Sequence, residues 1–454
     1  MLADRFQTVS QLLLPIWDSL KNNGKNTKEG DATIDPNLEK ELQRLLHERL
    51  IFQTSSSSSS VSSIYSEESE VDSSEFQLNW DDYHTGRKLG EGNFGVIHEL
   101  LQKQQTVSSD KRDVSLTRQQ QPQHRQRRTM AHTKTNCYAI KRAHNLPQIH
   151  KNPTTRRRRI RRRQKLQRLV DFEAELRILQ SVHHPNIITT YGTLVHPAEN
   201  VGSATTMLVM ERLYDTLEER MAVWKQTQLR QSSYHYHHSY SRQNPFVEEL
   251  DLPINPKRLL LALDISSALD YLHSHRILHR DIKPSNIAFD KNGTVKLFDF
   301  GLSRGFHTSP AKGNSPLWNY TSAVGSPRYM APEVALGDNY NELCDVYSFA
   351  LLLWELLSLQ TPYQHLSPMS MRESVFCSNQ RPRIHWSTWP ILIQDLLERS
   401  WSASLSERPS MNTIALVLGD VYSWIQYAEE QEESKMEHDV PFVMPAQLLP
   451  LVAV

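Results

Sequence analysis

The sequence predicts an α+β protein in which short strands come first and helices fill most of the remainder. Three strand-like segments precede residue 143, namely 83–89, 96–101 and 137–142. Apolar residues then recur mostly at three- and four-residue spacing from Val170 to Val182, as on one face of a helix. Residues 259–273 form another amphipathic pattern, and residues 345–359 are apolar nearly all round, which indicates a helix inside a large core.

The composition excludes an integral membrane protein and indicates a reducing compartment. Of 454 residues, 38% are hydrophobic and 22% are charged. A spanning helix needs roughly 20 apolar residues, whereas the densest apolar run, 349–357, is broken by Glu355. The cysteines are odd in number and lack paired spacing, which argues against a disulfide framework or a zinc site. They are Cys137, Cys344 and Cys377. We therefore expect a cytoplasmic location, a nuclear location, or both.

Three parts are expected along the chain. Residues 1–79 form an N-terminal extension whose serine runs and scattered carboxylates are typical of a largely disordered linker. Residues 80–426 form one domain, and residues 427–454 form an acidic and then apolar tail. The domain carries inserts near 102–135, 145–167 and 225–250.

The formal net charge is zero, but 20 Lys and Arg stand against 3 Asp and Glu between residues 97 and 170. The densest basic run, Arg156–Lys165, is interpreted as a solvated lead-in to the next helix, a nuclear import signal, a tether to the acidic ends of the chain, or a contact for nucleic acid or acidic membrane. A nuclear import receptor or another acidic partner is a possible ligand of this run, whereas nucleic acid is not expected to bind it. In the third insert, His235, His237 and His238 are expected to be exposed loop residues rather than metal ligands.

A glycine-rich turn separates the first two predicted strands. It contains Gly90, Gly92 and Gly95, and glycine lets a backbone approach phosphate oxygens without a side chain in the way. A dinucleotide-binding loop uses similar spacing, but it leads into a helix. Here a strand-like segment follows, which disfavours that alternative.

Four further motifs follow in a fixed order. They are Tyr138-Ala139-Ile140-Lys141, the run His279-Arg280-Asp281-Ile282-Lys283-Pro284-Ser285-Asn286, Asp299-Phe300-Gly301 and Ala331-Pro332-Glu333. With the glycine turn, this set resembles the eukaryotic protein kinase family over about residues 81–425. The resemblance implies a two-lobe α+β fold, with a small β-rich N-lobe that carries one key helix and a larger helical C-lobe. It also implies an ATP-dependent protein kinase that uses Mg²⁺ and acts in intracellular signalling.

The resemblance assigns the phosphate and metal contacts. Lys141 would hold the α- and β-phosphates of ATP, and Glu175 would pair with this lysine. Glu173 is the rival partner, but it lies about 200° from Glu175 on a helical wheel and points towards solvent, so we favour Glu175. Asn286 and Asp299 would ligate Mg²⁺ through oxygen atoms.

The resemblance also assigns the catalytic and adenine contacts. Asp281 would accept or orient the proton of the attacking hydroxyl, and Lys283 would reach the transferred phosphoryl group. The other nucleotide contacts would be Leu89, Gly90, Gly92, Gly95, Ile97, Ala139, Met210, Glu211 and Leu213. Ala288 departs from the family pattern, because a larger aliphatic residue usually lies under the adenine ring, so we expect weaker nucleotide binding. Structural roles are implied for Asp345, as an anchor of the catalytic loop, and for Arg408, as the partner of Glu333.

The acceptor is expected to be a Ser or Thr hydroxyl of a protein substrate. Lys283 and the segment 325–330 resemble serine/threonine kinases, since tyrosine kinases generally carry an Ala-Arg pattern in place of that lysine region. Residues 346–356 and 407–410 further resemble the tyrosine-kinase-like branch, whose members mostly phosphorylate Ser and Thr.

Regulation and alternative functions stay open. Arg280 before the catalytic aspartate suggests that a phosphate orders the activation segment, with Ser322 favoured over the adjacent Thr321 and Tyr320. A pseudokinase scaffold is the second functional class, and an arginine-rich nucleic-acid-binding protein with a subordinate kinase domain is the third.

Overall fold

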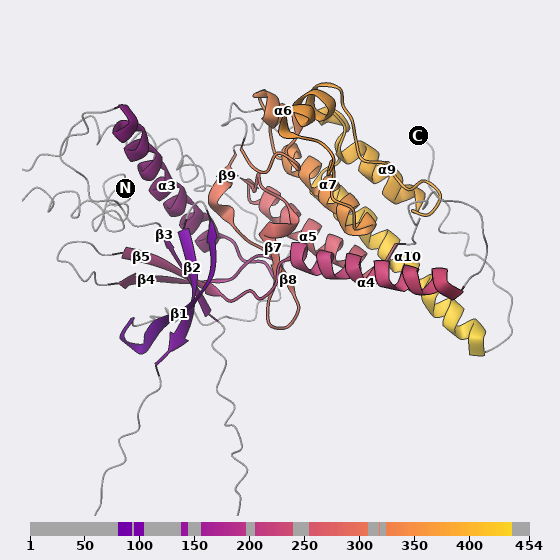
Figure 1. Cartoon of the computed structure of the whole chain (residues 1–454), viewed down its shortest axis with the longest axis horizontal. Helices are drawn as coiled ribbons and strands as arrows, with labels where there is room; N and C mark the ends of the chain where they lie inside the picture. Colours follow the sequence, from indigo (N-terminus) through magenta and orange to yellow (C-terminus); the bar gives the residue numbers. More distant parts are fainter. Residues whose placement is uncertain are drawn as a thin grey trace, which may run out of the picture. The chain divides into compact units, whose positions relative to one another are not determined.

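The computed structural model describes residues 80–92, 95–103, 138–143, 156–196, 205–238, 254–306, 317 and 324–437. These residues fall into two compact units, a first unit with a β-sheet and one helix and a second unit that is mainly helical (Figure 1). The short segments 289–294 and 299–301 belong to the first unit. The predicted two-lobe α+β fold is confirmed. The expected N-terminal extension, residues 1–79, lies outside the described residues.

The first unit is built on a five-stranded antiparallel sheet with the strand order β1-β2-β3-β5-β4. The strands are β1 (Tyr83–Gly92), β2 (Gly95–Gln102), β3 (Tyr138–Ala143), β4 (Thr190–His196) and β5 (Thr205–Glu211). The three strands expected from the sequence are therefore present. They are consecutive in the sheet, although a 34-residue stretch that the structure does not describe separates β2 from β3.

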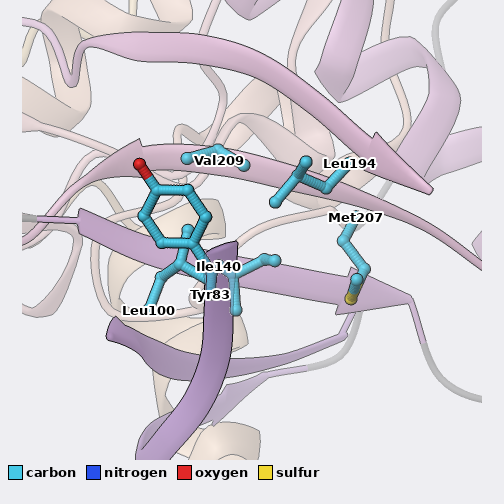
Figure 2. Close-up of a cluster of buried hydrophobic side chains, with 6 residues drawn as sticks. All are labelled: Tyr83, Leu100, Ile140, Leu194, Met207 and Val209. Carbon is cyan, nitrogen blue, oxygen red and sulfur yellow. The ribbon is translucent and has the colours of Figure 1, made fainter. Parts of the chain in front are cut away.

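Side chains alternate between the two faces of this sheet. Figure 2 shows one face, where Ile140 and Val209 are cross-strand neighbours in a buried cluster. The full cluster comprises Tyr83, Leu100, Ile140, Leu194, Met207 and Val209. Because the side-chain period is two, Lys141 and its partners Ile97 and Leu208 project from the opposite face.

Helix α3 (Arg156–Ser181) packs against β3 and β4. Its buried apolar residues between 170 and 179 include Val170, Leu176 and Leu179, in agreement with the predicted helical face. The helix begins at Arg156, so the basic run and the helix predicted from Val170 form one element. The last part of the second expected insert, 156–167, is thus helical.

The second unit is organised around long helices, most of which pack on one another (Figure 1). They are α4 (Leu217–His238), α5 (Pro256–Ser274), α7 (Leu343–Ser358), α9 (Ile391–Ser400) and α10 (Met411–Glu437). Helix α5 packs against α7 and α10, and α9 packs against α7 and α10. Shorter elements are β6 (Ile277–Leu278), β7 (Ile287–Phe289), β8 (Val295–Leu297), β9 (Arg304–Gly305), α6 (Pro332–Leu336) and α8 (Pro368–Met371).

Both helices predicted in this unit are present. The start of α5 is capped, and α7 is buried along nearly its whole length. Asn255 caps α5, since its side chain accepts hydrogen bonds from the N–H groups of Lys257 and Arg258, and Pro256 occupies the first turn. Residues 344–357 of α7 are all buried, so this helix runs through the core as its composition predicted.

One expectation about the third insert is wrong. His235, His237 and His238 were expected in a loop, but α4 continues to His238 and includes all three. The helix extends through a polar sequence whose Gln, Arg and Lys residues favour helix more than a loop composition suggests. In the described part of the chain, no group of three or more His, Cys, Asp or Glu is arranged to hold a metal ion. Among the same residues, no helix is both long and apolar enough to cross a bilayer.

Candidate functional site

The glycine turn connects β1 and β2, whose paired ends include Gly90 opposite Ile97 and Gly92 opposite Gly95. A Cβ atom added at Gly90 or Gly92 would meet no atom within 4 Å. The packing of the protein itself therefore does not require glycine at these two positions. The open space agrees with a backbone that a phosphate group approaches closely.

Lys141 and Glu175 form a buried ion pair within the first unit. The Nζ atom of Lys141 lies 2.5 Å from Oε1 and 2.7 Å from Oε2 of Glu175. Lys141 is fixed by β3, and Glu175 lies on the inward face of α3 with an exposed fraction of 2%. The rival Glu173 instead pairs with Arg177 at 3.0 Å and is only partly exposed. The prediction that Glu175 is the partner of Lys141 is confirmed.

Asp299 adds a second carboxylate to this pair. Its Oδ1 atom lies 3.6 Å from Nζ of Lys141, and its backbone adopts φ of 64°, a left-handed conformation that is uncommon outside glycine and is often found at functional sites. Burial alone would lower the pKa of Lys141, but Glu175 and Asp299 outweigh it and hold this pKa above the ordinary value. Lys141 is therefore a permanent cation suited to phosphate oxygens.

The predicted adenine contacts lie on the Lys141 face of the sheet and at the end of β5. Ala139 is directly opposite Met210, and both are buried. Glu211 donates its N–H to the carbonyl of Thr189 at 2.9 Å and accepts the N–H of Thr189 on Oε1 at 2.6 Å. These bonds fix the start of the hinge segment, residues 211–213, which the family resemblance places against the adenine. Leu89, Ile97 and Leu213 are half-buried, as residues that cover a ligand would be.

In the second unit, Asp281 and Lys283 form the other group of predicted catalytic residues. The Nζ atom of Lys283 lies 2.7 Å from Oδ2 of Asp281 and 2.8 Å from Oγ of Ser326. The N–H of Ser326 donates to Oδ1 of Asp281 at 2.9 Å. Burial would raise the pKa of Asp281, but the bonds and charge of Lys283 hold it below the ordinary value, so this carboxylate stays ionised at neutral pH.

Gly325 allows Ser326 to reach the catalytic loop. Its φ is +95°, and a Cβ atom there would lie 2.5 Å from the carbonyl oxygen of Arg280. Any other residue would clash with this backbone and push Ser326 away from Asp281. Glycine is thus required here by both conformation and close approach.

Asn286 is the predicted metal ligand of the second unit. Its amide nitrogen donates to the backbone carbonyl and to Oδ2 of Asp281, each at 2.9 Å. This leaves the amide oxygen as the atom suited to Mg²⁺. Asp299 supplies a carboxylate in the first unit, and such hard oxygen donors fit Mg²⁺, which typically takes one or two protein carboxylates together with substrate phosphates.

Asp345, fully buried at the start of α7, anchors the catalytic loop as predicted. Its carboxylate accepts the N–H groups of His279 at 2.8 Å and Arg280 at 2.7 Å, and it lies 3.1 Å from Nε2 of His273. Burial would raise the pKa of Asp345, but His273 and His279 outweigh this effect and lower it. The pairing with His273 was not predicted, because 72 residues separate the two in the sequence.

Arg280 also has partners that sequence reasoning missed. Its side chain donates to the carbonyl of Leu302, through Nε at 2.7 Å, and to the hydroxyl of Tyr340 through Nη1 at 3.0 Å. Tyr340 is fully buried. Ser322 and Thr321 lie outside the described residues, so phosphorylation at these positions stays a prediction.

Glu355 of α7 holds the segment that follows Ser326. It is 6% exposed and accepts a hydrogen bond from the hydroxyl of Tyr329. Burial raises the pKa of Glu355 to about 7. The side chains of Tyr329 and Arg328 act against this shift, while Glu218 of α4 adds to it.

In a Glu355→Gln variant, the free energy of unfolding is expected to depend less on pH than it does in the wild-type protein. Between the ordinary value of 4.5 and about 7, folded Glu355 keeps its proton while the unfolded chain releases it. The folded state then binds more protons, so this group makes stability fall as the pH rises through that window. Urea unfolding near pH 5 and near pH 8 should give wild type a steeper decline than the variant. Parallel declines would contradict the assignment.

Comparisons with known proteins agree with this geometry. The family model described as "Protein kinase domain" matches residues 129–416. The match begins within the first predicted insert, but β1 and β2 before it pair into the same sheet as β3. The fold was therefore accessible from sequence motifs.

Three curated relatives illustrate the similarity. The chain is 29% identical over 270 residues to serine/threonine-protein kinase STY17 of Arabidopsis thaliana, covering 60% of this chain and 40% of the relative. It is 34% identical over 250 residues to serine/threonine-protein kinase CTR1 of the same plant, covering 55% and 26%. It is 31% identical over 248 residues to serine/threonine/tyrosine-protein kinase HT1, also from this plant, covering 54% of each. The chain thus spans about a quarter to about half of the length of these relatives.

Proposed function

This chain belongs to the protein kinase family, and from that membership we propose that it transfers the γ-phosphate of ATP to Ser or Thr hydroxyls of protein substrates in intracellular signalling. The observation that carries the proposal is the group formed by Asp281, Lys283 and Ser326, in which a low-pKa carboxylate and a lysine ammonium are 2.7 Å apart. Phosphoryl transfer depends on positioning and charge neutralisation more than on covalent chemistry, and these residues supply both.

The first unit supplies the nucleotide contacts of the proposed reaction. Lys141, kept cationic by Glu175, pairs with the α- and β-phosphates, and Gly90 and Gly92 let the backbone approach the phosphate chain. The hinge segment and Ala139 hold the adenine. Ala288, in the second unit, is smaller than the aliphatic residue that the family usually carries beneath the base, so affinity for the nucleotide is expected to be modest.

The second unit supplies the acceptor chemistry. Asp281 accepts a hydrogen bond from the acceptor hydroxyl and orients its oxygen for attack on the γ-phosphorus. Lys283 offsets the negative charge on the transferred group while the bond from the γ-phosphorus to the bridging oxygen breaks. ADP leaves on the side opposite the attacking hydroxyl, whose proton passes to Asp281. Asn286 is the donor of this unit for Mg²⁺, which neutralises phosphate charge when bound, and Asp299 is the donor of the first unit.

The test is an initial-rate assay with radiolabelled ATP, Mg²⁺ and three peptides that differ only in carrying Ser, Thr or Tyr as the acceptor. We expect transfer to the Ser and Thr peptides, little to the Tyr peptide, and loss of transfer when EDTA removes Mg²⁺. Because the name of HT1 includes tyrosine, the Tyr peptide is an informative arm. Equal or greater label on it would overturn the acceptor assignment.

A cytoplasmic and/or nuclear location is proposed with this activity, with the run Arg156–Lys165 as the contact for a nuclear import receptor or another acidic partner. The support is its charge, since eight of ten residues are Arg or Lys. Replacing Arg156–Arg159 with Gln in a fluorescent fusion should reduce nuclear signal. An unchanged distribution would remove the import role.

A further inference from the structure

In the first unit, two arginine side chains approach the same carboxylate oxygen of Glu99. We name the group of Arg87, Glu99 and Arg212 the hinge clamp. Nε of Arg87 in β1 donates to Oε1 of Glu99 in β2 at 2.8 Å. Nη1 of Arg212, the central residue of the hinge segment, lies 3.0 Å from the same oxygen. One carboxylate therefore joins β1, β2 and the hinge segment.

The sheet register places the hinge clamp beside the proposed adenine contacts. Glu99 is directly opposite Ala139, and Ala139 is directly opposite Met210, so the three residues form one row across β2, β3 and β5. Directly opposite residues in antiparallel strands project from the same face. Glu99 also lies two residues after Ile97, hence on the face of that nucleotide contact.

The packing around Glu99 is close. A Cβ atom added at Gly86 would lie 3.0 Å from Cβ of Glu99 and 2.8 Å from Cδ1 of Leu101. The absence of a side chain at Gly86 lets β1 approach β2 beside Glu99. The register of the two strands shifts at this point, between Thr85 and Lys88. Arg87 lies at this register shift in β1, and its side chain reaches the carboxylate of Glu99.

The two arginines differ in burial. The side chain of Arg212 is 17% exposed and that of Glu99 is 12% exposed, whereas Arg87 is 70% exposed. Arg212 also lies 4.8 Å above the ring of Tyr214, a cation–π contact that restricts its orientation. The exposed Arg87 is screened by solvent, whereas the pair of Glu99 with Arg212 is largely buried and is the one that reaches the hinge segment. The hydrogen bond from Arg87 lowers the pKa of Glu99, which keeps the carboxylate charged at neutral pH.

We propose that Glu99 and Arg212 are positioning residues for nucleotide binding, because they tie the hinge segment to the two strands that cover the adenine. The proposal rests on the proposed ATP-dependent function. A fixed arrangement of Leu89, Ile97 and the hinge segment lowers the ordering cost of binding the base. Catalysis at Asp281 does not pass through the hinge clamp, so its loss should change affinity for the nucleotide and not the rate of the bound complex.

The test compares the affinity for ATP and ADP and the steady-state kinetics of wild type, Arg212→Met, Glu99→Gln and the double variant. We expect each single variant to raise the KM for ATP and the Kd for ADP by about 3- to 10-fold, with kcat within about twofold. The double variant should be no worse than Glu99→Gln, since that substitution already removes the pair with Arg212. Arg212→Met keeps Glu99 paired with Arg87, so it stays informative if Glu99→Gln folds poorly.

Asp395→Asn, which removes an exposed carboxylate from α9, is the matched control and should leave both constants unchanged. A lower melting temperature with unchanged KM and Kd would show a purely structural role and overturn the proposal. A fall in kcat without a change in Kd would also overturn it. Failure of the proposed function is distinguishable, because wild type would then bind ADP without transferring phosphate, while the ADP affinities would still report on the hinge clamp.

Discussion

An Asp281→Asn variant is expected to transfer phosphate about 10²- to 10⁴-fold more slowly than wild type while binding ATP with similar affinity. The carboxamide cannot accept the proton of the acceptor hydroxyl, and it carries no charge to pair with Lys283, whose Nζ atom lies 2.7 Å from the wild-type carboxylate. The nucleotide contacts at Lys141 and Glu175 are untouched. The loss should therefore fall on kcat and leave the KM for ATP nearly constant.

Asp395→Asn serves as the control for this substitution as well, because it makes the same chemical change on the surface of α9. Single-turnover transfer and nucleotide binding should be measured on both variants. A kcat of Asp281→Asn within about threefold of wild type would contradict the assigned role, since a positioned base contributes at least about 10²-fold.

An Arg408→Met variant is expected to lose about 3–5 kcal/mol of folding free energy. Arg408 has no exposed side-chain surface and binds Glu333 through two bonds, of 2.6 and 2.9 Å. It also donates to the carbonyls of Ser402 at 2.9 Å and Leu343 at 3.0 Å. Removing the guanidinium leaves a buried carboxylate and two carbonyls without these donors.

Arg399→Met provides the matched control for Arg408→Met. Arg399 is 53% exposed and lies 3.5 Å from Asp395, so its loss should cost less than about 1 kcal/mol. Urea unfolding of both variants measures the difference. If the two variants were equally stable, the buried pair of Arg408 and Glu333 would not hold α6 to the segment before α10.

The residues that could be predicted from the sequence are those that lie together in short motifs. Asp281, Lys283 and Asn286 lie within six consecutive residues, and the structure brings them within hydrogen-bond distance of one another. Glu175 was found because a helical period of 3.6 residues separates an inward-facing glutamate from Glu173 two positions earlier. Arg408 and Glu333 were paired through the family resemblance, and the structure confirms this pair.

The residues that sequence reasoning missed act over long separations or against local composition. Arg280 meets Tyr340 across 60 residues, and neither residue carries a local signal for the pair. Arg212 and Glu99 meet because β3 pairs with both β2 and β5 in the observed registers. The long insert before β3 prevents these registers from being predicted from the sequence. The helical ends of two expected inserts, 156–167 and 225–238, were missed because polar composition alone does not distinguish a solvated helix from a loop.

The most direct measurement of the central claim is γ-phosphate transfer from radiolabelled ATP by the wild-type chain with Mg²⁺, followed by phosphoamino-acid analysis of the labelled protein acceptor. The account predicts label on Ser or Thr, which is lost when Asp281 is replaced. Phosphotyrosine alone would contradict the acceptor class. Nucleotide binding without any transfer, even after treatment with an upstream kinase that phosphorylates Ser322 or Thr321, would contradict the enzyme itself and favour a scaffold that keeps the fold.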